Sequence, residues 1–200
     1  MKKTTYKSNF ISNFNLGRNI VSNVESLSVL YEVNTHLNSD QLNHIVKPKI
    51  VIIGSILEAI LYDFARKPNL QPLESKKFLN SIQIKNLRSK NTDVFKELIG
   101  VFRANNLFKF NGVGFYESLD RLRVLRNRIH IQNTKKELEE YESEAFTDDR
   151  LIESERSLEV VIKRMLELYD RGPSFAYVDD FELPWKSHLD TSTSAKSRRK

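Results

Sequence analysis

Four polar side chains lie at helical intervals in one short stretch of the chain, and their types suit chemistry on a phosphodiester. They are Arg123, Arg126, Asn127 and His130. On a helix, positions i, i+3, i+4 and i+7 share one stripe. Arginine offers a fixed fork of donors to phosphate oxygens, histidine exchanges a proton near neutral pH, and asparagine can orient either group. Such a set could remove a proton from a ribose 2′-hydroxyl and neutralise charge on the adjacent phosphorus without a metal.

A second interpretation of this stripe involves no chemistry. Helices that carry two arginines and a histidine on one side are common, and such a face can simply be solvated. His130 would then only cap or pack the helix. Spacing alone leaves both interpretations open.

The stripe must be positioned by a helix that we expect over residues 115–132. Four apolar residues of this helix, Leu119, Leu122, Leu125 and Ile129, fall on the adjacent face and predict a buried seam. The four polar residues would therefore converge along the edge of that seam.

The rest of the pattern predicts an all-α protein. Apolar residues recur at three- and four-residue intervals in five other regions, around 18–37, 41–66, 73–86, 94–102 and 150–169. Residues 50–64 are apolar on most faces, which is typical of a helix at the centre of a core. Pro48 predicts a kink or a fresh helix start. Thr147 and the two aspartates after it are expected to cap the last helix.

We divide the chain into four parts. We predict an irregular arm over residues 1–17 and a helical domain over residues 18–172. An extended segment is expected over residues 173–190, followed by a basic disordered tail over residues 191–200. Aromatic residues are expected to hold the arm and the extended segment against the helical body: Tyr6, Phe10, Phe14, Phe175, Tyr177, Phe181 and Trp185.

The net charge of +6 is unevenly distributed. Residues 103–136 contain eight basic and two acidic residues, whereas residues 137–160 contain ten acidic and two basic residues. The basic region could pair with the acidic region or bind a polyanion. Residues 186–200, with five basic residues against one acidic residue, could add non-specific affinity for nucleic acid.

The absence of cysteine excludes disulfide frameworks, thiol catalysis and cysteine-based zinc sites. The four histidines have no metal-ligand spacing, so we expect no metal and no cofactor. The longest apolar stretch, residues 50–60, is far shorter than the ~20 residues of a spanning helix. We therefore expect no membrane association and a cytoplasmic location.

Glu58 lies on the otherwise apolar stretch 50–64. A carboxylate in such a place must reach solvent or find a partner. An arginine of the basic region is the expected partner, either in a structural ion pair or as a member of an active site.

The run from Leu125 to His130, with Arg126-Asn127 and His130 at its core, resembles the signature of HEPN domains (higher eukaryotes and prokaryotes nucleotide-binding). The mid-helix Glu58, the Phe-x-x-Leu-Ile segment beginning at Phe95, and a long amphipathic helix after the histidine fit the same pattern. The resemblance covers roughly residues 50–169.

The resemblance implies a helical bundle, typically dimeric, that acts as a metal-independent endoribonuclease of a toxin–antitoxin or phage-defence system. Arg126, Asn127 and His130 would be its catalytic residues, with Glu58 as a distal acidic member. Arg123, Arg128 and Lys135 are the expected RNA contacts. RNA, a second copy of the chain and an antitoxin protein are the expected partners.

The spacing departs from the family pattern. Family motifs usually have four to six residues between arginine and histidine, whereas three separate Arg126 from His130; Arg123 would leave six. We favour Arg126 because it keeps the Arg-Asn pair and still aligns with His130 on a helix. Family members without cleavage activity serve as binding modules, so a non-catalytic module that binds nucleic acid or a partner protein is the alternative.

Overall fold

A computed structural model describes residues 4–66, 79–89, 94–109, 114–129, 141–172 and 177–189. The described chain is mostly helical, as predicted. Its α-helices are α1 (Phe14–Val33), α2 (Ser39–Arg66), α3 (Ser81–Ser89), α4 (Phe95–Ala104), α5 (Gly114–Asn127), α6 (Glu142–Ala145) and α7 (Asp148–Tyr169), with a 3-10 turn, η1 (Asn34–His36), after α1. Two short strands, β1 (Thr5–Tyr6) and β2 (Phe181–Glu182), form one antiparallel pair.

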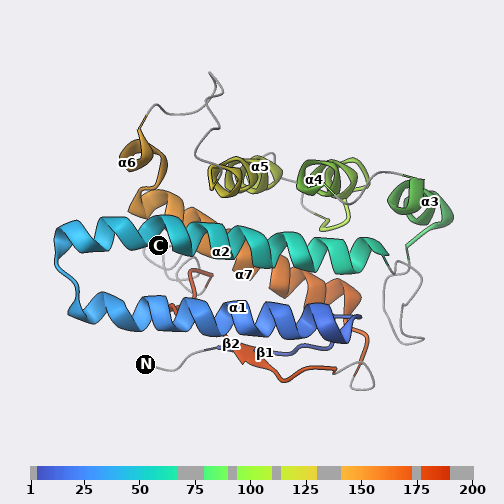
Figure 1. Cartoon of the computed structure of the whole chain (residues 1–200). Helices are drawn as coiled ribbons and strands as arrows, with labels where there is room; N and C mark the ends of the chain where they lie inside the picture. Colours follow the sequence, from blue (N-terminus) through green and yellow to red (C-terminus); the bar gives the residue numbers. More distant parts are fainter. Residues whose placement is uncertain are drawn as a thin grey trace, which may run out of the picture.

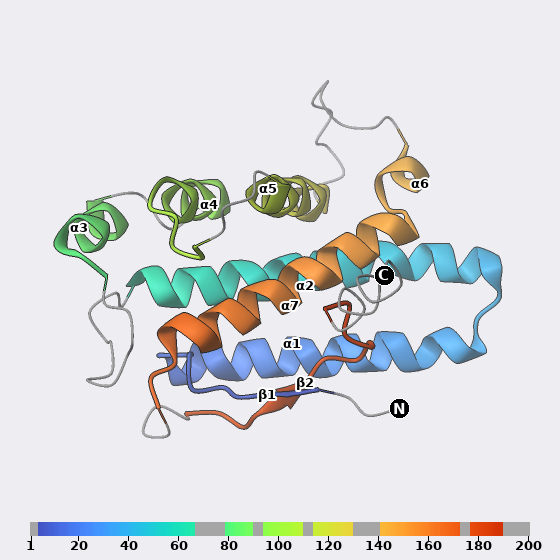
Figure 2. The same cartoon turned by 180° about the vertical axis from the view of Figure 1, so that it is seen from behind.

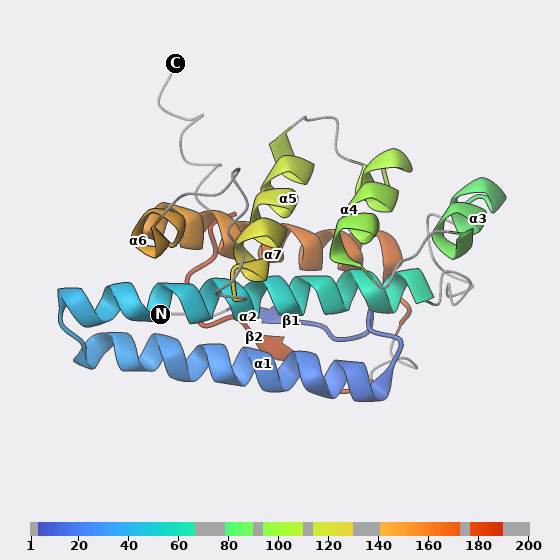
Figure 3. The same ribbon diagram turned by 45° about the horizontal axis from the view of Figure 1, so that its top comes forward.

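Helix α2 is the central element of the fold (Figure 1). It contacts α1, α4, α5 and α7 along its length. Seen from behind, α7 runs beside α2 with α1 below them, while α4 and α5 lie above (Figure 2). Tilting the molecule shows α4 and α5 crossing over α2 (Figure 3). The prediction that residues 50–64 belong to a helix at the centre of the core is therefore confirmed for α2.

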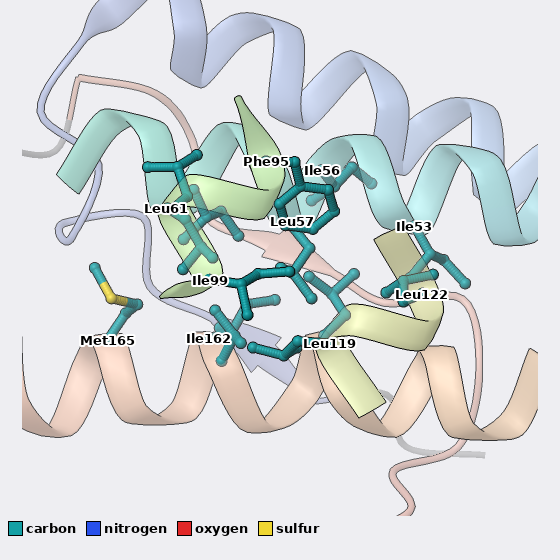
Figure 4. Packing of buried hydrophobic residues seen from close by; sticks show 14 of the residues in the cluster. Ile53, Ile56, Leu57, Leu61, Phe95, Ile99, Leu119, Leu122, Ile162 and Met165 are labelled. Atoms are coloured by element: carbon teal, nitrogen blue, oxygen red, sulfur yellow. The ribbon is translucent and has the colours of Figure 1, made fainter. Parts of the chain in front are cut away.

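The core lies where four helices meet (Figure 4). Its side chains come from α2, α4, α5 and α7, and they include Ile53, Ile56, Leu57, Leu61, Phe95, Ile99, Leu119, Leu122, Ile162 and Met165. Each of these is at most 3% exposed. Burial of aliphatic side chains on this scale supplies the main driving force for folding.

Two helix boundaries depend on caps. Thr147 precedes α7, and its hydroxyl accepts from the backbone N–H of Arg150 at 3.4 Å, as predicted for this cap. Asn13 caps α1, accepting from the N–H of Leu16 at 3.1 Å. Helix α1 therefore begins at Phe14, four residues before the predicted start, and ends at Val33. Helix α2 continues through Pro48 without a new start, because packing on its neighbours compensates for the missing backbone hydrogen bond.

The N-terminal arm is more ordered than an irregular arm would be. Phe10 and Ile11 are each 1% exposed, whereas Phe14 is 52% exposed. The buried carboxylate of Asp63, at the end of α2, accepts from the Ser12 backbone N–H at 2.7 Å and from its hydroxyl at 2.8 Å. The arm is thus fixed to the helical body by apolar burial and by one buried acid.

The C-terminal segment lies back across the body, as its aromatic residues indicated. Phe181 and Trp185 are buried, and the register pairs Tyr6 with Phe181. Tyr177 is 43% exposed. Phe175 and the tail 191–200 lie outside the described residues.

Candidate functional site

The candidate site lies where the last turn of α5 crosses α2. Gly54 of α2 faces α5 at this crossing: a Cβ added there would lie 2.9 Å from the Cβ of Arg126 and 3.5 Å from Leu122. The absence of a side chain at residue 54 therefore lets the two helix backbones approach closely. This contact sets the position of Arg126 relative to the neighbouring turn of α2.

Arg126 is held from two sides. Its Nη2 donates to Glu58 of α2, and its Nη1 donates to the amide oxygen of Asn127 at 3.0 Å. The arginine side chain is 30% exposed and that of Glu58 21% exposed. The structure therefore brings together three predicted site residues, Glu58, Arg126 and Asn127, at a partly open position.

Burial changes the acidity of Glu58. Desolvation raises the pKa of the Glu58 carboxyl above its usual range, and the adjacent Arg126 cation opposes this shift without cancelling it. A carboxyl whose pKa lies nearer to neutrality is better suited to exchanging a proton than an ordinary surface glutamate.

Arg123, one turn before Arg126, has a partner within its own helix. Its Nε donates to Asp120 at 2.7 Å, and its side chain is 18% exposed. This pair at i, i+3 offsets part of the positive charge of the stripe.

Arg128 does not project into solvent. Its side chain is 8% exposed, and its Nε donates to Glu142 of α6 at 3.4 Å. Lys47 of α2 pairs with the other oxygen of the same carboxylate and lies over the ring of Phe146. Arg128 therefore links the end of α5 to α6 and α2, and its burial argues against the direct RNA contact predicted for it.

Helix α5 ends earlier than predicted. The α-helix stops at Asn127, and the backbone N–H groups of Arg128 and Ile129 donate three residues back, to Leu125 and Arg126. Such bonds tighten the last turn of a helix. His130 and Lys135 lie outside the described residues, so only Arg123, Arg126 and Asn127 of the predicted stripe are placed on the helix.

A second polar cluster lies away from this site, under the C-terminal segment. Glu159 of α7 is 1% exposed. Its carboxylate accepts from the Trp185 indole N–H at 2.6 Å and from the Ser187 hydroxyl at 2.9 Å, and also from the His188 backbone N–H. Glu155, also buried, accepts from the Tyr31 hydroxyl and contacts the His188 ring. This cluster fastens the segment to α7.

Lys49 lies close to this second cluster and is 2% exposed. It donates to the Asn34 side chain at 2.6 Å and lies 4.3 Å from the centre of the Tyr31 ring. Burial lowers the pKa of Lys49 and raises the pKa of Tyr31. The polar groups of this cluster bind one another and fasten the C-terminal segment, so we assign the cluster a structural role.

Sequence reasoning missed three residues that build the candidate site. Gly54, Asp120 and Glu142 have no motif of their own, because their roles depend on which helices cross. Gly54 offered one signal, since a glycine inside an apolar helix often marks a close approach of another backbone.

Within the described ranges, no group of three His, Cys, Asp or Glu side chains is arranged to hold a metal ion. None of the helices described here has the length and apolar character needed to cross a membrane. No known family model, curated protein or solved structure matches the chain.

Proposed function

We propose that this protein is a metal-independent endoribonuclease whose active site is built on the last turn of α5. The observation that carries the proposal is the pairing of Arg126 with Glu58 and Asn127 at a partly open position. Arg126 lies four positions before His130. The resemblance of this run to HEPN domains supports the same assignment.

Cleavage would proceed by attack of the ribose 2′-oxygen on the adjacent phosphorus. The 2′-hydroxyl loses its proton, the new P–O bond forms, and the bond to the 5′-oxygen breaks as that oxygen gains a proton. The products are a 2′,3′-cyclic phosphate and a free 5′-hydroxyl. One group must therefore accept a proton while a second group donates one.

His130 and Glu58 are the proposed proton-transferring pair. Histidine titrates near neutral pH, and burial moves the pKa of Glu58 towards that range. Arg126 would stabilise the negative charge that develops on the phosphorus oxygens, because its guanidinium is charged and already oriented by two neighbours. Asn127 would orient the arginine and the phosphate.

RNA would be held by the cationic residues that flank this turn. We propose Arg123 and Lys135 as contacts to backbone phosphates, with Arg128 acting through the fold rather than on RNA. We further propose a homodimer, with an antitoxin protein as a further partner. The resemblance to HEPN domains, which are typically dimeric, supports the homodimer.

The test is cleavage of a defined RNA by the purified full chain in EDTA. We expect Arg126→Ala and His130→Ala each to lower the rate by at least about 10²-fold. Arg121→Ala is the matched control, since Arg121 lies on the same helix but pairs with Glu153 of α7. Circular dichroism melts would verify folding. Full activity of a folded His130→Ala protein would refute the assignment.

A second candidate function is a non-catalytic module that binds nucleic acid or a partner protein. The pairing of Arg123 with Asp120 and of Arg126 with Glu58 favours the protein-binding form of this function, because cations that are partly neutralised within the chain attract phosphate less strongly. This function predicts retained RNA or protein binding by a wild-type chain that leaves RNA intact.

A further inference from the structure

A groove lies on the opposite side of α1 from the α5 crossing, between the first half of α1 and the start of the C-terminal segment. Its volume is about 680 Å³. Its walls include Phe14, Arg18, Val21, Glu25, Tyr177 and Asp179. The backbones meet closely here, since a Cβ added at Gly17 would lie 3.0 Å from a methyl group of Val178.

The groove has uncommitted negative charge. Within the described part of the chain, neither Glu25 nor Asp179 takes part in an ion pair or a hydrogen bond of its side chain, and both residues are exposed. Asp180, by contrast, is occupied: it pairs with Lys7 at 2.8 Å and accepts from the Ser8 backbone N–H at 3.0 Å. Two carboxylates therefore remain for a ligand, beside one groove cation, Arg18.

The groove also offers aromatic faces. Phe14 and Tyr177 are 52% and 43% exposed. The guanidinium of Arg18 lies 5.7 Å from the centre of the Phe14 ring. The wall thus already holds one cation against an aromatic ring. Carboxylates beside exposed rings suit lysine and arginine side chains.

A strongly basic segment of the same chain follows the last described residue, Leu189. Residues 196–200 contain four basic residues in five positions. Residues 178–185 run along α1 from Gly17, which faces Val178, to Tyr31, whose ring centre lies 5.6 Å from that of Trp185. These two contacts are fourteen helical residues apart, which is roughly 21 Å along α1.

The chain can cover that distance. An extended chain advances about 3.3 Å per residue, so roughly seven residues are needed. Lys196 is seven residues after Leu189, and the remaining basic residues follow directly. We propose that this groove binds the basic segment 196–200 of its own chain, with Glu25 and Asp179 pairing with its cations. The proposal does not depend on the RNA-cleaving function.

The absence of cysteine allows a direct test on the full chain. A Ser197→Cys variant would carry a nitroxide spin label, and amide NMR signals would report on its position. We expect strong broadening of the signals of Glu25 and Val178. Adding Glu25→Lys and Asp179→Lys should reduce this broadening by at least about threefold, because two attractions become repulsions.

Two controls make the result specific. Glu32→Lys makes the same charge change as Glu25→Lys, on α1 but two turns beyond Glu25. It should leave the broadening intact. A second sample would mix spin-labelled chains of natural isotope content with isotope-enriched chains that carry no spin label. Broadening in this sample would detect contacts between molecules. Groove signals that are unaffected by the label, or broadened only between molecules, would overturn the proposal, as would full broadening in a folded double variant.

Discussion

Gly54 of α2 lies directly against the side chain of Arg126 of α5. A Cβ at residue 54 would lie 2.9 Å from the Cβ of Arg126 and 3.1 Å from its Cγ, closer than side chains normally approach. The position of the candidate catalytic arginine therefore depends on a glycine of the neighbouring helix.

We predict that Gly54→Ala lowers both stability and activity. The added methyl group gains up to about 1 kcal/mol of helix propensity but forces α5 away from α2, at a cost of about 1–3 kcal/mol. The net loss should be about 1 kcal/mol in the free energy of unfolding, measured by urea titration. RNA cleavage should fall further than stability explains, because Arg126 moves.

Gly100 of α4 provides the matched control. Nothing lies within 4 Å of a Cβ built there, so Gly100→Ala should raise the free energy of unfolding by roughly 0.5–1 kcal/mol. If both alanine variants gained stability equally, the close contact at Gly54 would not constrain the fold.

The raised pKa of Glu58 predicts how the stability of the fold depends on pH. Its pKa in the folded chain is raised above the ordinary value near 4.5, so the folded state binds this proton more tightly than the unfolded state. The stability that this tighter proton binding contributes is fully present below the pKa of Glu58 in the unfolded chain. It is lost as the pH rises through the pKa of Glu58 in the folded chain.

Glu58→Gln should therefore become more stable relative to wild type as the pH is raised from about 4.5 to 7. Urea titrations of both proteins at several pH values would measure this difference. A difference that stays constant over that range, or that changes in the opposite direction, would show that the pKa of Glu58 is not raised.

Arg123 and Arg128 should differ in their effects on RNA binding. Arg128 is buried against Glu142, whereas we assign Arg123 a phosphate contact. Arg123→Ala should reduce the slope of log affinity against log salt concentration by about 1, and Arg128→Ala should leave that slope unchanged. Fluorescence anisotropy with a labelled RNA at several salt concentrations would measure both. A reduced slope for Arg128→Ala would show that Arg128 contacts RNA after all.

The C-terminal segment should contribute to global stability through Glu159. Trp185→Phe keeps an aromatic ring beside Tyr31 but removes the indole N–H that donates to Glu159 at 2.6 Å. Leaving a buried carboxylate short of a donor should cost about 1–3 kcal/mol. Thermal melts would measure the loss, with Tyr141→Phe, a change at a residue that is 60% exposed, as the neutral control. Equal melting temperatures would argue against this role.

Much of the fold follows from periodicity. The regions that became α2, α4, α5 and α7 each carry an apolar stripe, and the expected partner of Glu58 was an arginine of the basic region, which the structure identifies as Arg126. These features depend on residues close in sequence or on the high cost of leaving a charge buried without a partner.

The features that escaped prediction depend on tertiary packing. The burial of Arg128 against Glu142 could not be predicted, because basic residues at helical spacing look alike whether they face solvent or a neighbouring helix. The early start of α1 depends on the Asn13 cap, which lies among many polar residues of the arm. The early end of α5 at Asn127 interrupts an apolar pattern that continues to Ile129. The prediction that Ile129 belongs to the buried seam is therefore wrong, since this side chain is 52% exposed.

The most direct test of the central claim is the chemistry of the RNA ends. The full chain would be incubated in EDTA with an RNA oligonucleotide, and with the same oligonucleotide carrying a single 2′-deoxyribose at the mapped cleavage position. We predict that the all-ribose RNA yields products ending in 2′,3′-cyclic phosphate. The deoxy-substituted RNA should bind with normal affinity but remain uncut. Equal cleavage of both substrates, or an intact all-ribose RNA, would contradict the proposed function.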